Sequence, residues 1–197
     1  MELILIRHGT TQGNLERRFI GLTDIPVLPE GEELAREVSK TLPPVDHVYH
    51  SPLIRCVQTA RLLWPDADMT VVDDLHETDF GPFEGKSHQE LKDDPLYQQW
   101  LATNGCGDIP GVESVEAAAR RMARGIRWIL ADAAARSFSR VGVASHGGSL
   151  MVLMNAVGAP KRPNANDWLC GNCGGWRVEA EAEPLGLTVL EELEGRK

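Results

Sequence analysis

Short apolar segments alternate along this chain with longer segments that have helical spacing. The short segments are typical of strands in a sheet, and they lie at 2–6, 46–51, 69–73 and 140–145. Helices are expected at 29–42, 52–64, 114–134 and 147–158. Pro29 suits the first turn of one helix, and Ser114 suits the N-cap of the longest one.

The order of these segments favours an α/β fold with three layers, in which helices flank a mostly parallel central sheet. Near the end of the chain, "WRVEAEAE" and "LTVLEEL" alternate apolar and polar residues, which predicts two edge strands. No repeat, low-complexity tract or linker divides the sequence. We therefore expect a single domain over 1–197.

Composition and charge narrow the classes of partner. The net charge of -9 disfavours nucleic acid and anionic membranes, because both attract basic surfaces. An acidic protein can still bind an anion if its few arginines gather in one pocket. The sequence has no long apolar run and no secretory signal pattern, and its four cysteines are too few for a disulfide scaffold. These features predict a cytoplasmic protein.

Three of the expected strands are followed by polar motifs. Arg7 and His8 follow the first strand, "HSPLIR" places Arg55 after the second, and "SHGG" places His146 after the strand at 140–145. The ends of parallel strands converge on one crevice of an open α/β sheet. Two arginines and two histidines at one point would repel each other unless an anion lay between them. A phosphoryl group is the natural ligand, since its oxygens match guanidinium groups.

The same residues predict a reaction. A neutral imidazole can attack phosphorus and form a covalent intermediate, while arginines neutralise the charge on the phosphoryl oxygens. The leaving alkoxide then needs a proton from a carboxylic acid. The segment "HETDFGPFEG" offers Glu77, Asp79 and Glu84, of which Glu77 is favoured. Glu84 could equally bind backbone amides in a glycine-rich turn.

Four segments together resemble a known family. They are "LIRHGTTQGN", "SPLIRCVQTA", "HETDFGPFEG" and "VASHGG", and they occur in the order found in the phosphoglycerate-mutase-like branch of the histidine phosphatase superfamily. The resemblance implies a helical lid insertion at about 84–113. It also implies that the ligand is a small-molecule phosphate monoester, that no cofactor or metal is needed, and that a homodimer is possible.

The resemblance also assigns roles by position. It implies that His8 is phosphorylated and that Glu77 donates the proton, with His146 as the third catalytic residue. It places Arg7, Asn14, Arg55 and again His146 around the substrate phosphate. All of these residues are present, which favours an active enzyme over an inactive binding module of the same fold.

The choice between a phosphatase and a mutase depends on further cations. Typical mutases carry an arginine and a tyrosine where this chain has Thr78 and Phe80, and an arginine pair in the stretch 86–119, which here contains only Lys86 and Lys92 as Lys or Arg. We therefore predict a phosphatase. The lid resembles that of α-ribazole phosphatases of cobalamin synthesis; a broad-specificity sugar phosphatase and a phosphoglycerate mutase are the alternatives.

Two other motifs have plainer interpretations. The segment "CGNC" at 170–173 could be a redox pair or half of a zinc site, but no second ligand pair accompanies it. A turn or strand beside the core is the preferred interpretation. The arginines of "ARRMAR", at 120, 121 and 124, are expected on a solvated helix face, although one of them could reach the pocket mouth.

Overall fold

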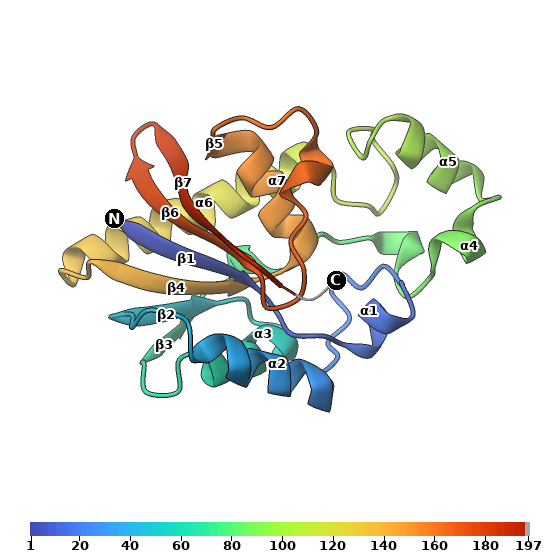
Figure 1. Ribbon diagram of the computed structural model, residues 1–197. Coiled ribbons are helices and arrows are strands. Elements are labelled where there is room, and N and C mark those ends of the chain that lie inside the picture. Colours follow the sequence, from blue (N-terminus) through green and yellow to red (C-terminus); the bar gives the residue numbers. More distant parts are fainter. Residues whose placement is uncertain (196–197) are drawn as a thin grey trace.

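The computed structural model describes residues 1–195 and shows a seven-stranded sheet with helices on both faces (Figure 1). The sheet has the order β3-β2-β4-β1-β6-β7-β5. Its strands are β1 (Glu2–Arg7), β2 (His47–His50), β3 (Met69–Val71), β4 (Arg140–Ser145), β5 (Gly158–Ala159), β6 (Gly175–Ala182) and β7 (Leu185–Leu193). The expected three-layer α/β architecture is confirmed.

Most pairs of neighbouring strands are parallel. β1 runs parallel to β4, β4 to β2, and β2 to β3, while β6 runs antiparallel to both β1 and β7. The prediction that the last two long strands are edge strands is wrong, because β5 and β3 form the edges. Alternation of apolar and polar residues indicates that one face of a strand is exposed to solvent. It does not indicate whether the strand has a hydrogen-bonded neighbour on both sides.

The helices differ in length, and only some of them cover the faces of the sheet. They are α1 (Gln12–Leu15), α2 (Pro29–Ser39), α3 (Ile54–Leu63), α4 (His88–Leu91), α5 (Pro95–Ala102), α6 (Val115–Ala135) and α7 (Gly147–Val157), with short 3-10 helices η1 (Asp73–Leu75), η2 (Gly81–Phe83) and η3 (Ala165–Trp168). Ser114 caps α6 as expected, accepting a hydrogen bond from the Ala117 amide. The strand expected at 69–73 ends at Val71, and the helix expected at 29–42 ends at Ser39.

Two hydrophobic cores lie on opposite faces of the sheet. Leu3 and Leu5 of β1 belong to the core under α6 and α7, whereas Ile4 and Ile6 belong to the core under α2 and α3. All four side chains are fully buried, which explains why the first strand reads as a continuous apolar run. This burial on both faces fixes β1 in the middle of the fold and fixes the point at which it ends.

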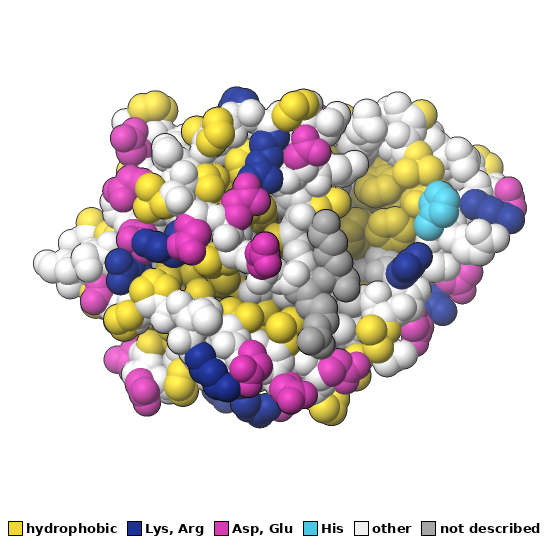
Figure 2. Space-filling view, viewed as in Figure 1, with side chains coloured by type: hydrophobic (Ala, Val, Ile, Leu, Met, Phe, Trp, Pro, Cys, Tyr) yellow, Lys and Arg dark blue, Asp and Glu magenta, His cyan; other side chains and the backbone are white. Residues whose placement is uncertain are grey.

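Residues 84–113, called the 84–113 segment below, project beside the sheet and contain α4 and α5. A third, small apolar cluster holds them, in which Leu91, Tyr97 and Ile109 pack with Phe83. Figure 2 shows a hollow between this segment and the body of the molecule, with hydrophobic side chains inside it. Among residues 1–195 there is no helix with the length and apolar character that a membrane crossing requires.

Candidate active site

The parallel strands β1, β2 and β4 end at one edge of the sheet, and this edge brings the predicted residues together. His8 follows β1, Arg55 lies in the first turn of α3, and His146 is the N-cap residue of α7 directly after β4. The rings of His8 and His146 lie 5.3 Å apart between centroids, in an edge-to-face arrangement. The sequence had placed both histidines at strand ends, and the structure places them side by side.

His8 is held in the form that a nucleophile needs. Its Nδ1 lies 2.7 Å from the Gly9 carbonyl oxygen, which can only accept, so Nδ1 carries the hydrogen and Nε2 keeps its lone pair. Burial, and then the charges of Arg7 and Arg55, hold the pKa of His8 well below its ordinary value. The imidazole is therefore neutral near pH 7, and Nε2 keeps its lone pair.

His146 and Arg55 are hydrogen-bonded to each other and to the residues around them. The Arg55 Nε donates to His146 Nδ1 at 3.1 Å, so His146 Nε2 carries the hydrogen and donates to Ser51 Oγ at 2.7 Å. The other ends of the Arg55 guanidinium donate to the carbonyls of Thr23 and Gly21, at 2.9 and 2.7 Å. Burial, and then His8, lower the pKa of His146. In this arrangement both side chains are buried beneath His8.

Arg7 lies at the floor of a pocket and keeps donors for a ligand. Its Nη1 donates to the Cys170 carbonyl at 2.8 Å, whereas its buried Nε has no hydrogen-bond partner among residues 1–195. The guanidinium packs directly on the start of α7: a Cβ added at Gly147 would lie 3.1 Å from Arg7 Nε. A glycine at this position therefore lets the arginine approach the helix N-terminus, where an anion is also favoured.

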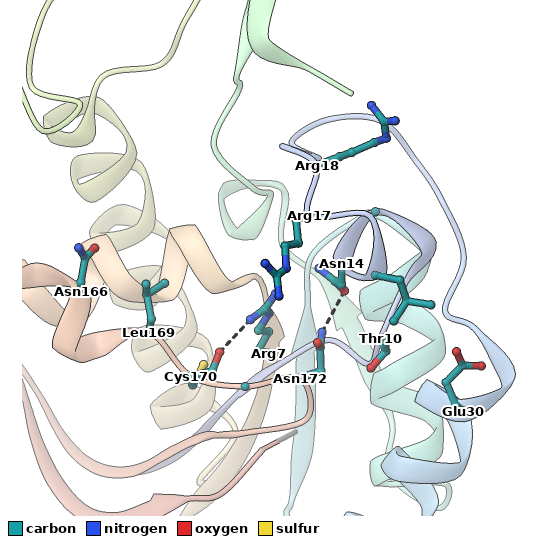
Figure 3. A pocket seen from close by; sticks show the side chains of 13 residues that line it. Arg7, Thr10, Asn14, Arg17, Arg18, Glu30, Asn166, Leu169, Cys170 and Asn172 are labelled. Carbon is teal, nitrogen blue, oxygen red and sulfur yellow. Dashed lines mark hydrogen bonds between the residues drawn. The ribbon is translucent and has the colours of Figure 1, made fainter. Parts of the chain in front are cut away.

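Asn14 is oriented by donors that all bind the same oxygen. Its Oδ1 receives hydrogen bonds from the Thr11 amide, the Thr11 hydroxyl and Asn172 Nδ2, at 3.0, 3.1 and 3.1 Å. Its amide nitrogen is consequently left to donate into the pocket (Figure 3). Asn172 also donates to the His8 carbonyl at 3.0 Å and is buried, and the sequence analysis missed it.

Glu77 is fixed against the N-terminus of α7. Its Oε1 accepts from the amides of Thr78 and Ser149, both at 2.8 Å, while Oε2 accepts from the Gly148 amide at 3.0 Å. A Cβ at Gly148 would lie 2.8 Å from Glu77 Oε1, so the second glycine of "SHGG" makes room for this carboxyl group. Within residues 1–195, the Gly148 amide is the one donor to Oε2, so this oxygen has a second lone pair that is not used.

The two other candidate carboxylates have structural partners. Glu84 accepts from the amides of Gly21 and Thr23, at 2.9 and 3.1 Å, which is the backbone-binding role considered for it. Asp79 accepts from the Gly81 amide at 2.9 Å and so stabilises the turn that begins η2. Of the three acidic residues in "HETDFGPFEG", Glu77 is the one buried against α7, where it packs on Gly148, the residue after the glycine that packs on Arg7.

A pocket of about 880 Å³ opens between α1 and the loop that follows η3. Of the predicted site residues, Arg7 and Asn14 line it, whereas the buried His8, Arg55, Glu77 and His146 do not. Arg7, Asn14 and Asn172 line its floor, and Arg17 and Arg18 line its wall (Figure 3). Arg18 is paired with Glu16 and Glu90, whereas no ion pair within residues 1–195 includes Arg17. Arg17 therefore retains its charge for a ligand, and the sequence analysis did not single it out.

A second cavity of about 570 Å³ lies next to the pocket and shares Asn166 with it. Trp100 and Leu101 of α5 line one side, and Met151 and Val152 of α7 line the other. We call this cavity the apolar groove. It lies where the 84–113 segment faces the body of the molecule.

The "CGNC" segment is a loop beside the core, as expected. Cys173 is buried and its amide donates to the Arg7 carbonyl at 3.0 Å. Burial raises the pKa of the Cys170 thiol to about 11, so this thiol is protonated near pH 7. Across residues 1–195, no group of three acidic, histidine or cysteine side chains is arranged to hold a metal ion.

Comparison with known proteins identifies the class that this geometry belongs to. The family model of the histidine phosphatase superfamily (branch 1) matches residues 3–191, so the chain belongs to that superfamily. Members act as phosphatases or mutases. Over 193 residues the chain is 32% identical to the probable phosphoglycerate mutase GpmB of Enterobacter sp. (strain 638), covering 93% of this chain and 87% of the relative.

Two solved structures are similar over almost their whole length. A putative alpha-ribazole-5'-P phosphatase from Escherichia coli str. K-12 substr. MG1655 has a TM-score of 0.82 at 24% identity, covering 100% of this chain and 98% of that one; this likeness concerns the fold. The phosphoserine phosphatase of Entamoeba histolytica, solved with 3-phosphoglyceric acid, has a TM-score of 0.82 at 27% identity, covering 98% and 96%.

Proposed function

We propose that the protein is a phosphomonoesterase that acts through a phosphohistidine at His8. The observation that carries this proposal is a neutral, buried His8 whose Nε2 keeps its lone pair, next in sequence to Arg7, which lines a pocket together with Asn14. These donors suit the oxygens of a phosphoryl group as its charge redistributes in the transition state. Arg55 is hydrogen-bonded to His146, and the His146 ring packs edge-to-face on the ring of His8.

The proposed reaction has two steps. In the first, His8 Nε2 forms a bond to phosphorus while the bond to the ester oxygen breaks, and Glu77 Oε2 gives its proton to the departing alcohol. In the second, water attacks the phosphohistidine, Glu77 takes a proton from that water, and the bond to Nε2 breaks to release phosphate. Glu77 gives one proton to the alcohol and regains one from water, so the proposed steps balance without a metal or cofactor.

We propose hydrolysis rather than phosphoryl transfer between two hydroxyls. A mutase must hold a doubly phosphorylated intermediate, which calls for several cations beyond the first phosphate site. Here Lys86 and Lys92 are exposed, and neither lines the pocket. Phe80, at the position of the mutase tyrosine, packs on Phe19 with ring centroids 5.2 Å apart.

We propose α-ribazole 5'-phosphate as the substrate, with the apolar groove as the site of its benzimidazole. Trp100 and Leu101 give the groove an aromatic and aliphatic wall that suits a flat heterocycle. The groove meets the phosphate pocket at Asn166, so one ligand can occupy both. In this proposal the enzyme is cytoplasmic, which agrees with cysteines that are all free in residues 1–195.

One observation favours a second candidate substrate class. Arg17 is an unpaired cation in the phosphate pocket, and it would suit a carboxylate next to the ester, as in phosphoglycerate. The test is a panel of α-ribazole 5'-phosphate, 3-phosphoglycerate, sugar phosphates and an aryl phosphate, assayed without added metal. A clear preference for α-ribazole 5'-phosphate is expected. Equal turnover of all esters would contradict the substrate assignment, and interconversion of phosphoglycerates would contradict hydrolysis.

A further inference from the structure

Arg121 of α6 is buried, although its sequence context predicted a solvated helix face. Its side chain is 8% exposed and forms a two-pronged ion pair with Glu113, with Nε–Oε1 at 2.8 Å and Nη2–Oε2 at 2.7 Å. A buried, bidentate pair of this kind fixes both side chains in one geometry. Arg124, one turn away, is 66% exposed and does lie on the solvated face.

The remaining arm of Arg121 holds the turn that leads into Glu77. Nη1 donates to the carbonyls of Asp74 and His76, both at 2.8 Å. The His76 carbonyl also lies 2.7 Å from the Ser149 hydroxyl, which in turn lies 2.9 Å from Glu77 Oε1. Arg121 therefore fixes the backbone directly before Glu77 and one partner of its carboxyl group.

Glu113, the last residue of the 84–113 segment, holds the chain on the other side of Glu77. Its amide donates to the Asp79 carbonyl at 2.8 Å, and its Oε2 accepts from the Asp79 amide at 3.4 Å. Glu77 thus lies between two fixed points, one held by Arg121 and one by Glu113. The ion pair between Arg121 and Glu113 joins the backbone before Glu77 to the backbone after it, and both to the end of the 84–113 segment.

The other end of the segment is linked to Arg55 through two loop residues. Glu84 binds the amides of Gly21 and Thr23, and the carbonyls of the same two residues accept from Arg55. A disturbance at Glu84 should therefore reach the arginine beneath His8. A disturbance at Glu113 should reach the proton donor.

We infer that Glu113 and Arg121 are positioning residues for Glu77, which link the end of the 84–113 segment to proton transfer. This inference rests on the proposed role of Glu77 as the proton donor. A mispositioned acid slows the release of poor leaving groups, which need the proton, more than the release of good ones. The dependence of rate on the leaving group therefore separates positioning of Glu77 from a general structural role.

The experiment measures kcat/KM of Arg121→Lys and Glu113→Gln with p-nitrophenyl phosphate and with a simple alkyl phosphate. We expect a loss of about tenfold for the alkyl ester and less than about threefold for the aryl ester. Arg120→Gln is the matched control on the same helix and should leave both values unchanged, because Arg120 is exposed and no ion pair within residues 1–195 includes it. Glu84→Gln should lower both values by the same factor, because it acts through Arg55.

Thermal unfolding shows which variants are folded. If a single variant does not fold, the double variant Glu113→Gln/Arg121→Met removes both charges together and takes its place. Equal losses for both esters in the folded Arg121 and Glu113 variants would overturn the inference, provided that Glu77→Gln still shows the difference between esters. If Glu77→Gln itself shows no difference, the proposed acid role fails, and the inference fails with it.

Discussion

The strand-end site and the 84–113 segment are built in opposite ways. At the strand ends, His8, Glu77 and His146 are at most 6% exposed, and each has fixed hydrogen-bond partners. The 84–113 segment relies on a small apolar cluster and leaves Leu96 and Leu101 of α5 exposed. Burial and full pairing preserve one geometry, whereas an exposed apolar wall can be changed at little cost to folding.

This contrast suggests a division of labour. In our account the strand ends hold and cleave the phosphate ester, while α5 and the apolar groove contact the leaving group. Structures with different names, a phosphoserine phosphatase and a phosphoglycerate mutase, have TM-scores of 0.82 and 0.75 to this chain. A common scaffold with a variable wall would allow one chemistry to serve several substrates.

The largest effect is expected from removing the nucleophile. His8→Ala should lower kcat by about 10⁴-fold or more, because no other group can form the covalent intermediate. Steady-state phosphate release measures this loss, with the circular dichroism spectrum as the check on folding. Residual turnover near the wild-type rate would remove His8 from the mechanism.

A charge in the apolar groove should affect substrate recognition and spare the chemistry. Leu101→Glu is expected to raise KM for α-ribazole 5'-phosphate about 30-fold, since burying an unpaired charge against a heterocycle is costly. KM for a small alkyl phosphate should change by less than about twofold. Leu96→Glu is the matched control, because Leu96 lies on the same helix with 38% exposure but does not line the groove. Similar effects of both variants would contradict the role of the groove.

Asn172 offers a test on the strand-end side of the comparison. Replacing it with leucine removes the donor that orients Asn14 and satisfies the His8 carbonyl. We expect kcat/KM to fall about tenfold for every substrate, aryl and alkyl alike, since the phosphate site itself is disturbed. A loss confined to α-ribazole 5'-phosphate would show that Asn172 contacts the leaving group instead of supporting the phosphate site.

The smallest effect concerns pH. The pKa values of His8 and His146 are lowered in the folded state, first by burial, so the unfolded chain binds more protons below about pH 6.5. The free energy of unfolding should therefore fall as the pH falls from about 6.5, by up to about 1.4 kcal/mol per pH unit for each group. Denaturant titrations of wild type and His146→Gln at several pH values measure the free energy of unfolding. If this free energy changed with pH by the same amount in both proteins, the prediction would be contradicted.

The sequence predicted the strand-end residues because their signal is local. One apolar run is followed at once by Arg7 and His8, and another is followed by "SHGG". Each of these patterns predicts a strand and the residue at which it ends. The structure brings His8, Arg55, Glu77 and His146 to one edge of the sheet. Their catalytic roles remain predictions that the experiments above address.

What the sequence did not predict depends on contacts between distant residues. Arg121 and Arg124 lie one turn apart on α6, yet Arg121 is buried against Glu113, which precedes the helix, whereas Arg124 is exposed and pairs with Asp74. Asn172 lies between Cys170 and Cys173, and the interpretation of this loop considered only the two cysteines. The pairing of β7 with the two-residue strand β5 likewise leaves no pattern in either segment. A periodicity reports which face is buried, but not what lies against it.

The most direct test of the central claim is the position of the phosphoryl group in the reacting enzyme. Wild-type protein is mixed with substrate, quenched within the first turnover under conditions that preserve phosphohistidine, and digested for mass spectrometry. Our account predicts one phosphoryl group, on His8, formed before phosphate is released and undetectable in His8→Ala. A phosphoryl group on another residue, or turnover with no phosphorylated enzyme, would contradict it.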